Sequence, residues 1–332
     1  MSFQIVQLRE QHLECAAALF GARYRTLREK VPLLPPRYEQ ANAILPMLYD
    51  LLSGSPGVVA LQGNRLIGFL TGSVLPAFLG KRSVYSPEWA NGAELGESRR
   101  VYEEMYAQLA GPWVADGCFT HLVSMLGHDR EGIEGWQWLG FGLAAVDGLR
   151  GLQPLPGGRV GLEVRRATLG DIGDVVALAE ALDRHLAAPP AFWLHGHRDY
   201  NQWSRDPANA LWLAHEGDEA LGFMALEPGH SGGCQIIQEA KTVSIVGAFT
   251  QAHTRGRGIA TALLNTALEW VREEGYERCA VDFEPMNTLA ARFWLRHFEP
   301  VCYTLMRSID ERIGSWRKRR SANCSVRWTR GS

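Results

Sequence analysis

The sequence predicts an α+β fold with two domains, on the evidence of its length, a mid-chain linker and an internal repeat. Its 332 residues exceed the size of one ordinary domain. Residues 153–160 combine Pro and Gly and separate two regions of periodic hydrophobicity, as an interdomain linker does. In the second region, predicted strand pairs are mixed with predicted helices, which is the α+β pattern.

Each half of the chain contains a similar strand-turn-strand segment. Residues 60–69 (ALQGNRLIGF) align without gaps on residues 214–223 (AHEGDEALGF), and Gly-Asn or Gly-Asp supplies the turn. Residues 138–141 (WLGF) are likewise similar to residues 294–298 (WLRHF), with one residue added. Two matches in the same order favour a duplicated domain. The predicted parts are a first domain over 1–152, a linker over 153–160, a second domain over 161–312 and a basic tail over 313–332.

The composition is that of a soluble globular protein without a strong charge bias. Hydrophobic residues make up 46% of the chain, charged residues 21%, and the formal net charge is −2. This balance favours neither a nucleic-acid nor a membrane partner, and no apolar run is long enough to cross a bilayer. The six cysteines are scattered without the spacing of a zinc site, and four lie among apolar neighbours. We expect a cytoplasmic protein without a signal peptide or metal, and a homodimer is compatible with these features.

The second domain has the most readable order of elements. Thr168 is predicted to cap a helix, and Asp171 completes a capping box. A helix over 258–274 has one apolar face and ends at Gly275. Asn287 is predicted to open a short helix that runs to residue 297. The predicted strands lie at 162–166, on both sides of Gly217, and at 243–250, 278–284 and 301–309.

The loop between strand 243–250 and helix 258–274 has the features of a phosphate cradle. A helix start exposes unpaired N–H groups and the positive end of the helix dipole. Gly256 and Gly258 let the backbone approach an anion closely, and two arginines add positive charge. The loop is neither a Walker loop nor a dinucleotide GxGxxG. Alone, it is either a pyrophosphate cradle or a basic surface loop that caps a helix.

The surrounding residues resemble the GNAT superfamily of N-acetyltransferases. The family hallmark, Gln/Arg-x-x-Gly-x-Gly/Ala, is matched by residues 255–260 (RGRGIA). The family's next strand and its Asn-x-x-Ala-x-x-Phe segment are similar to residues 281–293 (VDFEPMNTLAARF). The resemblance covers roughly residues 164–309 and implies two tandem GNAT-like domains, each a mixed, mostly antiparallel sheet flanked by helices. Residues 95–100 (LGESRR) lack the glycine spacing, so the first domain is expected to be degenerate.

This resemblance implies that acetyl-CoA binds in the second domain as a co-substrate. Its pyrophosphate would lie on backbone N–H groups of the loop, and its pantetheine arm would pair with the preceding strand. The backbone of that strand also offers an oxyanion-type contact to the thioester. The Asn at the start of the late helix often contacts the cofactor, and an N-cap role is expected for it in any case. The implied cofactor-binding residues are Gly247, Ala248, Phe249, Arg255, Gly256, Arg257, Gly258, Ile259, Ala260 and Asn287.

Two acidic residues are candidates for the base that takes a proton from the acceptor amine. In some family members a Glu five positions before the Asn has this role, and Asp282 holds that position here. Glu284 lies two residues later, which places it on the same face of a strand. The pair is either a solvated edge or an amine-binding and base pair, and the adjacent cofactor site favours the second interpretation.

The sequence departs from the family pattern at Trp294. Many members have a Tyr at this place that protonates the departing thiolate, whereas an indole N–H is not a usable acid. We expect Trp294 to be a core aromatic. Tyr303 and His297 are the nearest candidates in sequence for the acid, and Tyr303 is the predicted one, unless the thiolate leaves unassisted.

The resemblance therefore implies an enzyme that moves acetyl from acetyl-CoA directly to a primary amine of a small molecule or peptide. The missing Tyr leaves a second interpretation open, which is a CoA-binding pseudoenzyme that acts as a sensor or scaffold. Acceptor pockets of this fold are built from variable loops, so the sequence does not identify the amine.

Overall fold

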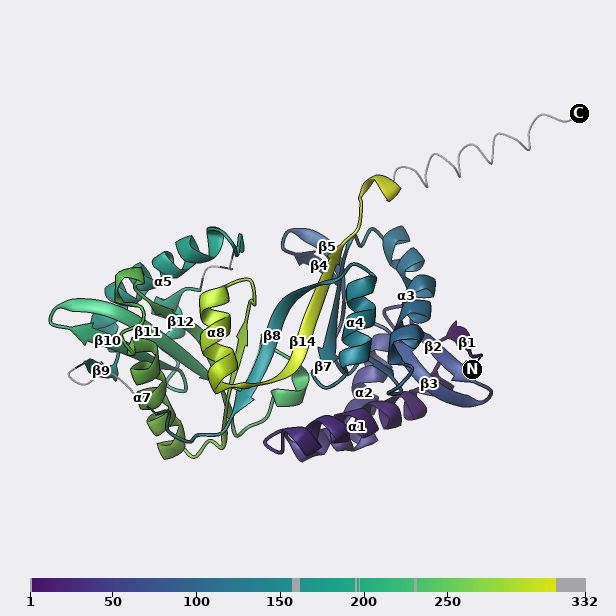
Figure 1. The fold of residues 1–332 in the computed structure, drawn as a ribbon, viewed down its shortest axis with the longest axis horizontal. Coiled ribbons are helices and arrows are strands. Elements are labelled where there is room, and N and C mark those ends of the chain that lie inside the picture. The colour runs from purple at the N-terminus through teal and green to yellow at the C-terminus, as the bar shows by residue number, and fades with distance from the viewer. Residues whose placement is uncertain (1, 157–161, 195, 197, 230–231, 315–332) are drawn as a thin grey trace, which may run out of the picture. The chain divides into compact units, whose positions relative to one another are not determined.

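The computed structural model describes the chain except for residues 1, 157–161, 195, 197, 230–231 and 315–332. Most of the predicted basic tail, and part of the predicted linker, lie outside the described residues. The chain forms two compact units (Figure 1). Unit 1 comprises Met1–Lys30, Pro36–Leu143 and Tyr303–Ser332, and unit 2 comprises Val31–Pro35 and Ala144–Cys302.

Unit 1 contains a four-stranded sheet in the order β1-β2-β3-β6, and a second group of strands in the order β4-β5-β7-β14. Its strands are β1 (Gln4–Gln7), β2 (Val58–Gln62), β3 (Arg65–Leu70), β4 (Ser73–Phe78), β5 (Lys81–Ser86), β6 (Asn91–Ala93), β7 (Thr120–Leu126) and the end of β14 (Glu299–Ser308). Its helices are η1 (Glu10–His12), α1 (Leu13–Lys30), η2 (Pro36–Glu39), α2 (Ala41–Leu52), α3 (Ser98–Ala115) and α4 (Arg130–Trp138). Aromatic and aliphatic side chains of α3, α4 and the neighbouring strands form its core.

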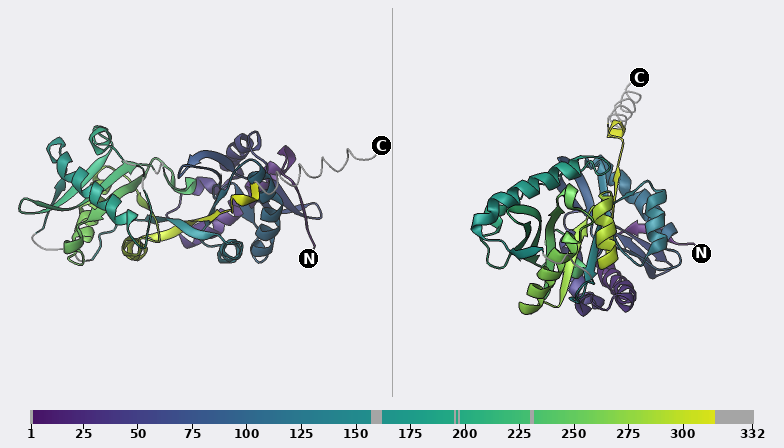
Figure 2. Two further views of the ribbon diagram at one scale, coloured as in Figure 1. Left: turned by 90° about the horizontal axis from the view of Figure 1, so that it is seen from above. Right: turned by 60° about the vertical axis from the view of Figure 1, so that its left-hand side comes forward.

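Unit 2 contains strands in the order β14-β8-β13-β12-β11-β10-β9. They are β8 (Gly142–Arg150), β9 (Glu163–Arg166), β10 (Ala210–Glu216), β11 (Glu219–Pro228), β12 (Thr242–Thr250) and β13 (Arg278–Phe283), with the start of β14. The helices are η3 (Leu169–Asp171), α5 (Ile172–Ala187), α6 (Tyr200–Trp203), η4 (Gln235–Ile237), η5 (Ala252–Thr254), α7 (Ile259–Glu273) and α8 (Thr288–His297). Helix α7 packs on β9 to β12, and α5 packs on β11 and β12 (Figure 2).

The strand pairing confirms the predicted fold class. Strands β12 and β13 are parallel, as are β5 and β7, and the other pairs with a defined register are antiparallel. Both units are therefore mixed, mostly antiparallel sheets with helices packed on them. None of the described helices is long and apolar enough to cross a membrane.

Two long strands divide between the units in a way that the sequence does not predict. The part of β8 from Ala144 onward belongs to unit 2, where it pairs with β13. The part of β14 from Tyr303 onward belongs to unit 1, where Leu305 is fully buried in the core. The division thus differs from the predicted domains 1–152 and 161–312. Hydrophobic alternation identifies a buried strand but does not say which sheet the strand joins.

The hairpins of the two units confirm the internal repeat. In β2–β3 the register shifts between Ala60 and Leu61, and in β10–β11 it shifts between Ala214 and His215, which are the aligned positions. The turn glycines of the two hairpins have φ of 61° and 63°. A shared bulge is a specific backbone feature, because it requires one extra residue at the same place in β3 and in β11.

The N-caps of α4 and α8 change the alignment of residues 138–141 with residues 294–298 by two positions. Asp129 caps α4 by accepting the N–H of Gly132, and Asn287 caps α8 by accepting the N–H of Ala290. Counting from these caps places Trp136, and not Trp138, at the position of Trp294. Burial agrees, since Trp136 is 1% exposed, Trp294 is 6% exposed and Trp138 is 71% exposed.

Candidate functional site

The loop between β12 and α7 begins the helix without a side-chain cap. Gly258 is the N-cap in the left-handed conformation, with φ of 79°, and Gly256 has φ of 78°. A Cβ added to Gly256 would have no neighbour within 4 Å, so this side of the loop is open. Gly258 offers no side chain to the first N–H groups of α7, which therefore remain available to an anion.

A cavity of about 420 Å³ lies beside this loop. Eight of the predicted cofactor-binding residues line it, namely Ala248, Phe249, Arg255, Gly256, Gly258, Ile259, Ala260 and Asn287. The Arg255 guanidinium lies 5.7 Å from the centre of the Phe249 ring, which holds its charge at the cavity. Arg257 instead pairs with Glu216 at 2.7 Å, outside the lining.

The cavity lies where two parallel strands separate. Strand β12 pairs with β13 only from Thr242 to Ile245, whereas its pairing with β11 continues to Thr250. A register shift against β11 leaves Val246 unpaired at the point of separation. Beyond this point, no described strand pairs with the edge of β12 that faced β13, so this edge can pair with an extended ligand.

A second cavity of about 310 Å³ adjoins the first. Both candidate base residues, Asp282 and Glu284, line it, although β13 ends at Phe283 and Phe283 lines the same cavity, so strand alternation does not account for their placement. Gly247 also lines this cavity. The residues that line both cavities are Leu182, Ala248, Asn287, Ala290 and Trp294. The two spaces are therefore separated only by a shared wall.

Acidic groups outnumber basic ones in the second cavity. Besides the two candidate bases, Asp183 and Glu227 line it, and Arg198 is the one Lys or Arg among the lining residues described. Arg198 pairs with Glu227 at 3.0 Å, and the Trp203 indole N–H donates to the same carboxylate oxygen at 3.0 Å. The cavity thus favours a cation.

Asn287 has two roles in the structure. Its side-chain oxygen accepts the Ala290 N–H at 3.4 Å, which is the N-cap role predicted from the sequence. The same oxygen lies 3.2 Å from Nε2 of His185 on α5. His185 lines the first cavity and was not identified from the sequence, because no motif marks it and it lies 102 positions away.

Trp294 is buried but also forms part of the shared wall. Its ring contacts Phe293 and Phe298 edge-on, as a core aromatic does. The predicted acid Tyr303 lies in unit 1 and lines neither of these two cavities. His297 lines neither cavity as well. Strand β14 leaves unit 2 directly before Tyr303, so proximity in sequence to Trp294 does not place Tyr303 in the lining of either cavity.

The structure places a different tyrosine at the second cavity. Tyr200 of α6 is 6% exposed and packs its ring against Phe223 and Trp203. Burial raises the pKa of Tyr200 to about 12, against the opposing influence of Arg198. The sequence gives only an aromatic-rich segment here, with no motif that marks the residue.

The corresponding place in unit 1 is filled by a buried side chain. Strand β6 pairs with β3 and precedes α3, as β12 pairs with β11 and precedes α7. At the end of β6, the Arg23 guanidinium donates to the Ala93 carbonyl and pairs with Asp129 at 2.7 Å. An arginine thus occupies the end of the strand, which supports the expected degeneracy of the first domain.

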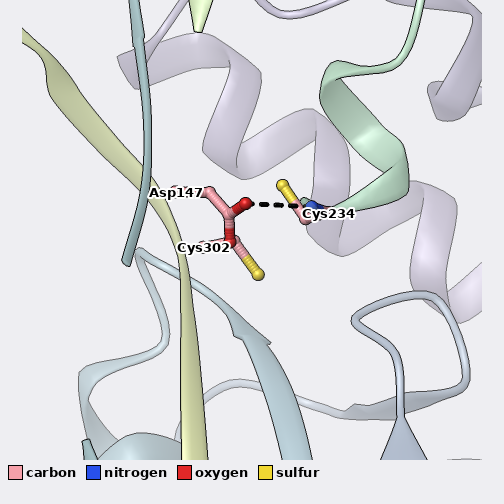
Figure 3. Close-up of side chains that lie close together, drawn as sticks. All are labelled: Asp147, Cys234 and Cys302. Atoms are coloured by element: carbon pink, nitrogen blue, oxygen red, sulfur yellow. Dashed lines mark hydrogen bonds between the residues drawn. The ribbon is translucent and has the colours of Figure 1, made fainter. Parts of the chain in front are cut away.

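Unit 2 also contains a buried group of potential metal ligands (Figure 3). One carboxylate oxygen of Asp147 and the sulfurs of Cys234 and Cys302 all lie within 4.8 Å of one another. The Cys234 N–H donates to Asp147 at 2.9 Å, so the carboxylate also anchors the start of η4. The three residues come from distant segments, which is why cysteine spacing gave no sign of the group.

Comparison with known proteins agrees with this geometry. The model of the acetyltransferase (GNAT) family matches residues 178–298. A GCN5-related N-acetyltransferase from Sphaerobacter thermophilus is 17% identical, with a TM-score of 0.57 over 92% of this chain and 95% of that one. A GCN5-related glucosamine N-acetyltransferase region of a fungal multi-domain GH3 β-N-acetylglucosaminidase is 12% identical, with a TM-score of 0.52 over 92% of this chain and 38% of that one. No curated protein matches the sequence. Residues 178–298 thus match the acetyltransferase (GNAT) family model, and the fold of the chain is similar to that of GCN5-related N-acetyltransferases.

Proposed function

We propose that this protein transfers acetyl from acetyl-CoA directly to a primary amine of a small molecule or peptide. The observation that carries the proposal is the pair of adjoining cavities at the separated strands β12 and β13. One cavity is lined by the glycine loop and the other by carboxylates. Direct transfer needs donor and acceptor sites that meet, and these two share Ala248 and Asn287 in their wall.

The residues of the first cavity fit the donor. The uncapped start of α7, the open side of Gly256 and the Arg255 guanidinium would hold the pyrophosphate. The free edge of β12 would pair with the pantetheine arm, and its N–H groups would stabilise negative charge on the thioester oxygen. When bound, acetyl-CoA supplies an activated acyl group.

The residues of the second cavity fit a cationic acceptor. A lysine-like amine has a pKa of about 10.4, so it arrives protonated at neutral pH. The excess of carboxylates attracts the ammonium. Asp282 or Glu284 then accepts its proton, directly or through an ordered water, and the free amine can attack.

Trp294 favours a second candidate, a CoA-binding pseudoenzyme that senses or scaffolds. The family tyrosine is missing at this position, and the indole supplies no acid. This candidate shares the donor site but predicts no turnover.

Free-thiol release from acetyl-CoA, measured with a panel of primary amines, separates the two candidates. The proposal predicts thiol release that depends on at least one amine. Saturable acetyl-CoA binding without release for any amine supports the pseudoenzyme, and absence of binding contradicts both.

A further inference from the structure

We propose that Tyr200 donates the proton that the departing CoA sulfur takes up, in place of the tyrosine that Trp294 replaces. The inference rests on the proposed function. Tyr200 lies on α6, far in sequence from α8 and β14, which hold His297 and Tyr303.

The position of the hydroxyl carries the argument. The Tyr200 oxygen lies so close to Gly247 that a Cβ there would overlap it. Gly247 is on the part of β12 that has separated from β13, next to Ala248 in the wall between the cavities. A hydroxyl at this strand is therefore beside the place where the donor cavity opens toward the acceptor cavity.

Among the described residues, nothing holds the hydroxyl away from a ligand. Within the described part of the chain it has no hydrogen-bond partner, although the side chain is more than nine-tenths buried and lines the second cavity. The charged groups that influence it are Arg198, Asp183 and Glu227. Glu227 is already held by Arg198 and by the Trp203 indole.

The Tyr200 phenol is protonated at neutral pH, as a proton donor must be. Burial raises the pKa of Tyr200 to about 12, so the phenol keeps its proton across the neutral and mildly alkaline range. A phenol that faces the cavity gains a charged hydrogen bond when a thiolate forms beside it, and this bond exists only late in the reaction.

The step balances without any further reactant. As the C–N bond forms and the C–S bond breaks, the electron pair of the C–S bond stays on sulfur, and Tyr200 gives its proton to that sulfur. The acylated nitrogen loses one proton, which returns to the Tyr200 oxygen through the carboxylates or water of the second cavity. One amine N–H is thus exchanged for one thiol S–H.

The first test measures binding and needs no turnover. Calorimetry would give Kd for CoA and for desulfo-CoA from pH 6.5 to 9.5, in the wild-type chain, in Tyr200→Phe and in Tyr276→Phe. Tyr276 is a partly buried tyrosine of the same unit that lines neither cavity, so it is the matched control.

A donor to the thiolate lowers the pKa of the bound thiol below its free value of about 8.5. CoA should then bind more tightly as pH rises toward that value, by about tenfold for each unit of lowering, while desulfo-CoA should not. Tyr200→Phe should lose this pH-dependent gain, and Tyr276→Phe should keep it. A merely structural role would weaken both ligands equally at every pH. That result, or an unchanged gain in Tyr200→Phe, would overturn the inference.

The second test measures turnover. Tyr200→Phe should lower kcat by about 10²- to 10⁴-fold while KM for acetyl-CoA changes little. Wild-type kcat in Tyr200→Phe would refute the inference and leave the proposed function standing. If the wild-type chain acetylates no amine, the proposed function fails by itself, and the CoA and desulfo-CoA titrations still decide on Tyr200.

Discussion

The hydroxyl of Tyr200 occupies the space that a Cβ on Gly247 would need. A side chain from α6 thereby closes directly on the backbone of β12, at the stretch where the strand has left β13. Because Gly247 has no side chain, the Tyr200 hydroxyl fits against the backbone at this position. A larger residue at 247 would displace the hydroxyl.

This complementarity predicts a coupled effect on stability. Gly247→Ala should lower the free energy of unfolding by about 1–3 kcal/mol, because the added methyl overlaps the hydroxyl. Tyr200→Phe in the same chain should recover most of the loss, since the next nearest atom, on Phe223, would lie 3.3 Å from the added methyl carbon. Denaturant unfolding of the two single variants and the double variant measures the coupling. Additive losses would show that the two residues do not compete for this space.

The two arginines of the loop should differ in their effect on acetyl-CoA binding. Arg255 lines the first cavity, whereas Arg257 pairs with Glu216 outside it. Arg255→Ala should weaken binding by about 1.5–3 kcal/mol, as the loss of a charged hydrogen bond does, and Arg257→Ala by clearly less. Calorimetric Kd values at one salt concentration test this order. Equal losses would mean that both side chains reach the ligand.

The carboxylates of the second cavity should control the pH dependence of the reaction. Asp282→Asn or Glu284→Gln should lower kcat/KM most near neutral pH, where nearly all the amine is protonated. The defect should shrink at alkaline pH, because more free amine is present without help. Rate profiles from pH 6 to 10 for both variants test the assignment, and two profiles identical to wild type would refute it.

The stability of unit 1 should depend on the part of β14 that begins at Tyr303. Leu305 is fully buried in its core, so Leu305→Ala should cost about 2–5 kcal/mol in the free energy of unfolding. Leu295→Ala is the matched control, because Leu295 is 52% exposed. Thermal and denaturant unfolding of both variants measure the difference. Equal, small effects would contradict the placement of β14 in unit 1.

Features that arise from neighbouring residues could be predicted from the sequence. The capping box of Thr168 and Asp171 forms as expected, with the Thr168 N–H donating to Asp171 at 2.7 Å. Asn287 caps α8, and Gly258 and Gly275 bound α7. Each depends on backbone and side-chain chemistry within a few positions, which a local pattern contains.

Features that depend on distant contacts could not be predicted. No local pattern marks Tyr200, the proposed acid, because its position at Gly247 follows from the packing of α6 on β11 and β12. The passage of β14 from unit 2 to unit 1 likewise depends on which strand it pairs with, and a local pattern does not contain that information. By contrast, eight of the predicted cofactor residues lie on one strand-loop-helix segment and the start of α8, and they line one cavity. A local pattern contains most of this set.

A calorimetric titration of acetyl-CoA into the wild-type chain, Gly258→Glu and Gly275→Glu tests directly whether the loop before α7 binds the cofactor. Gly258 caps the start of α7 and Gly275 follows its end, with φ of 79° and 78°, so both substitutions impose similar backbone strain and the same charge. We expect one site per chain in the wild type and in Gly275→Glu, and no measurable binding in Gly258→Glu, where a carboxylate would lie in the loop that receives the pyrophosphate. Unchanged affinity in Gly258→Glu, or two sites per wild-type chain, would contradict this expectation.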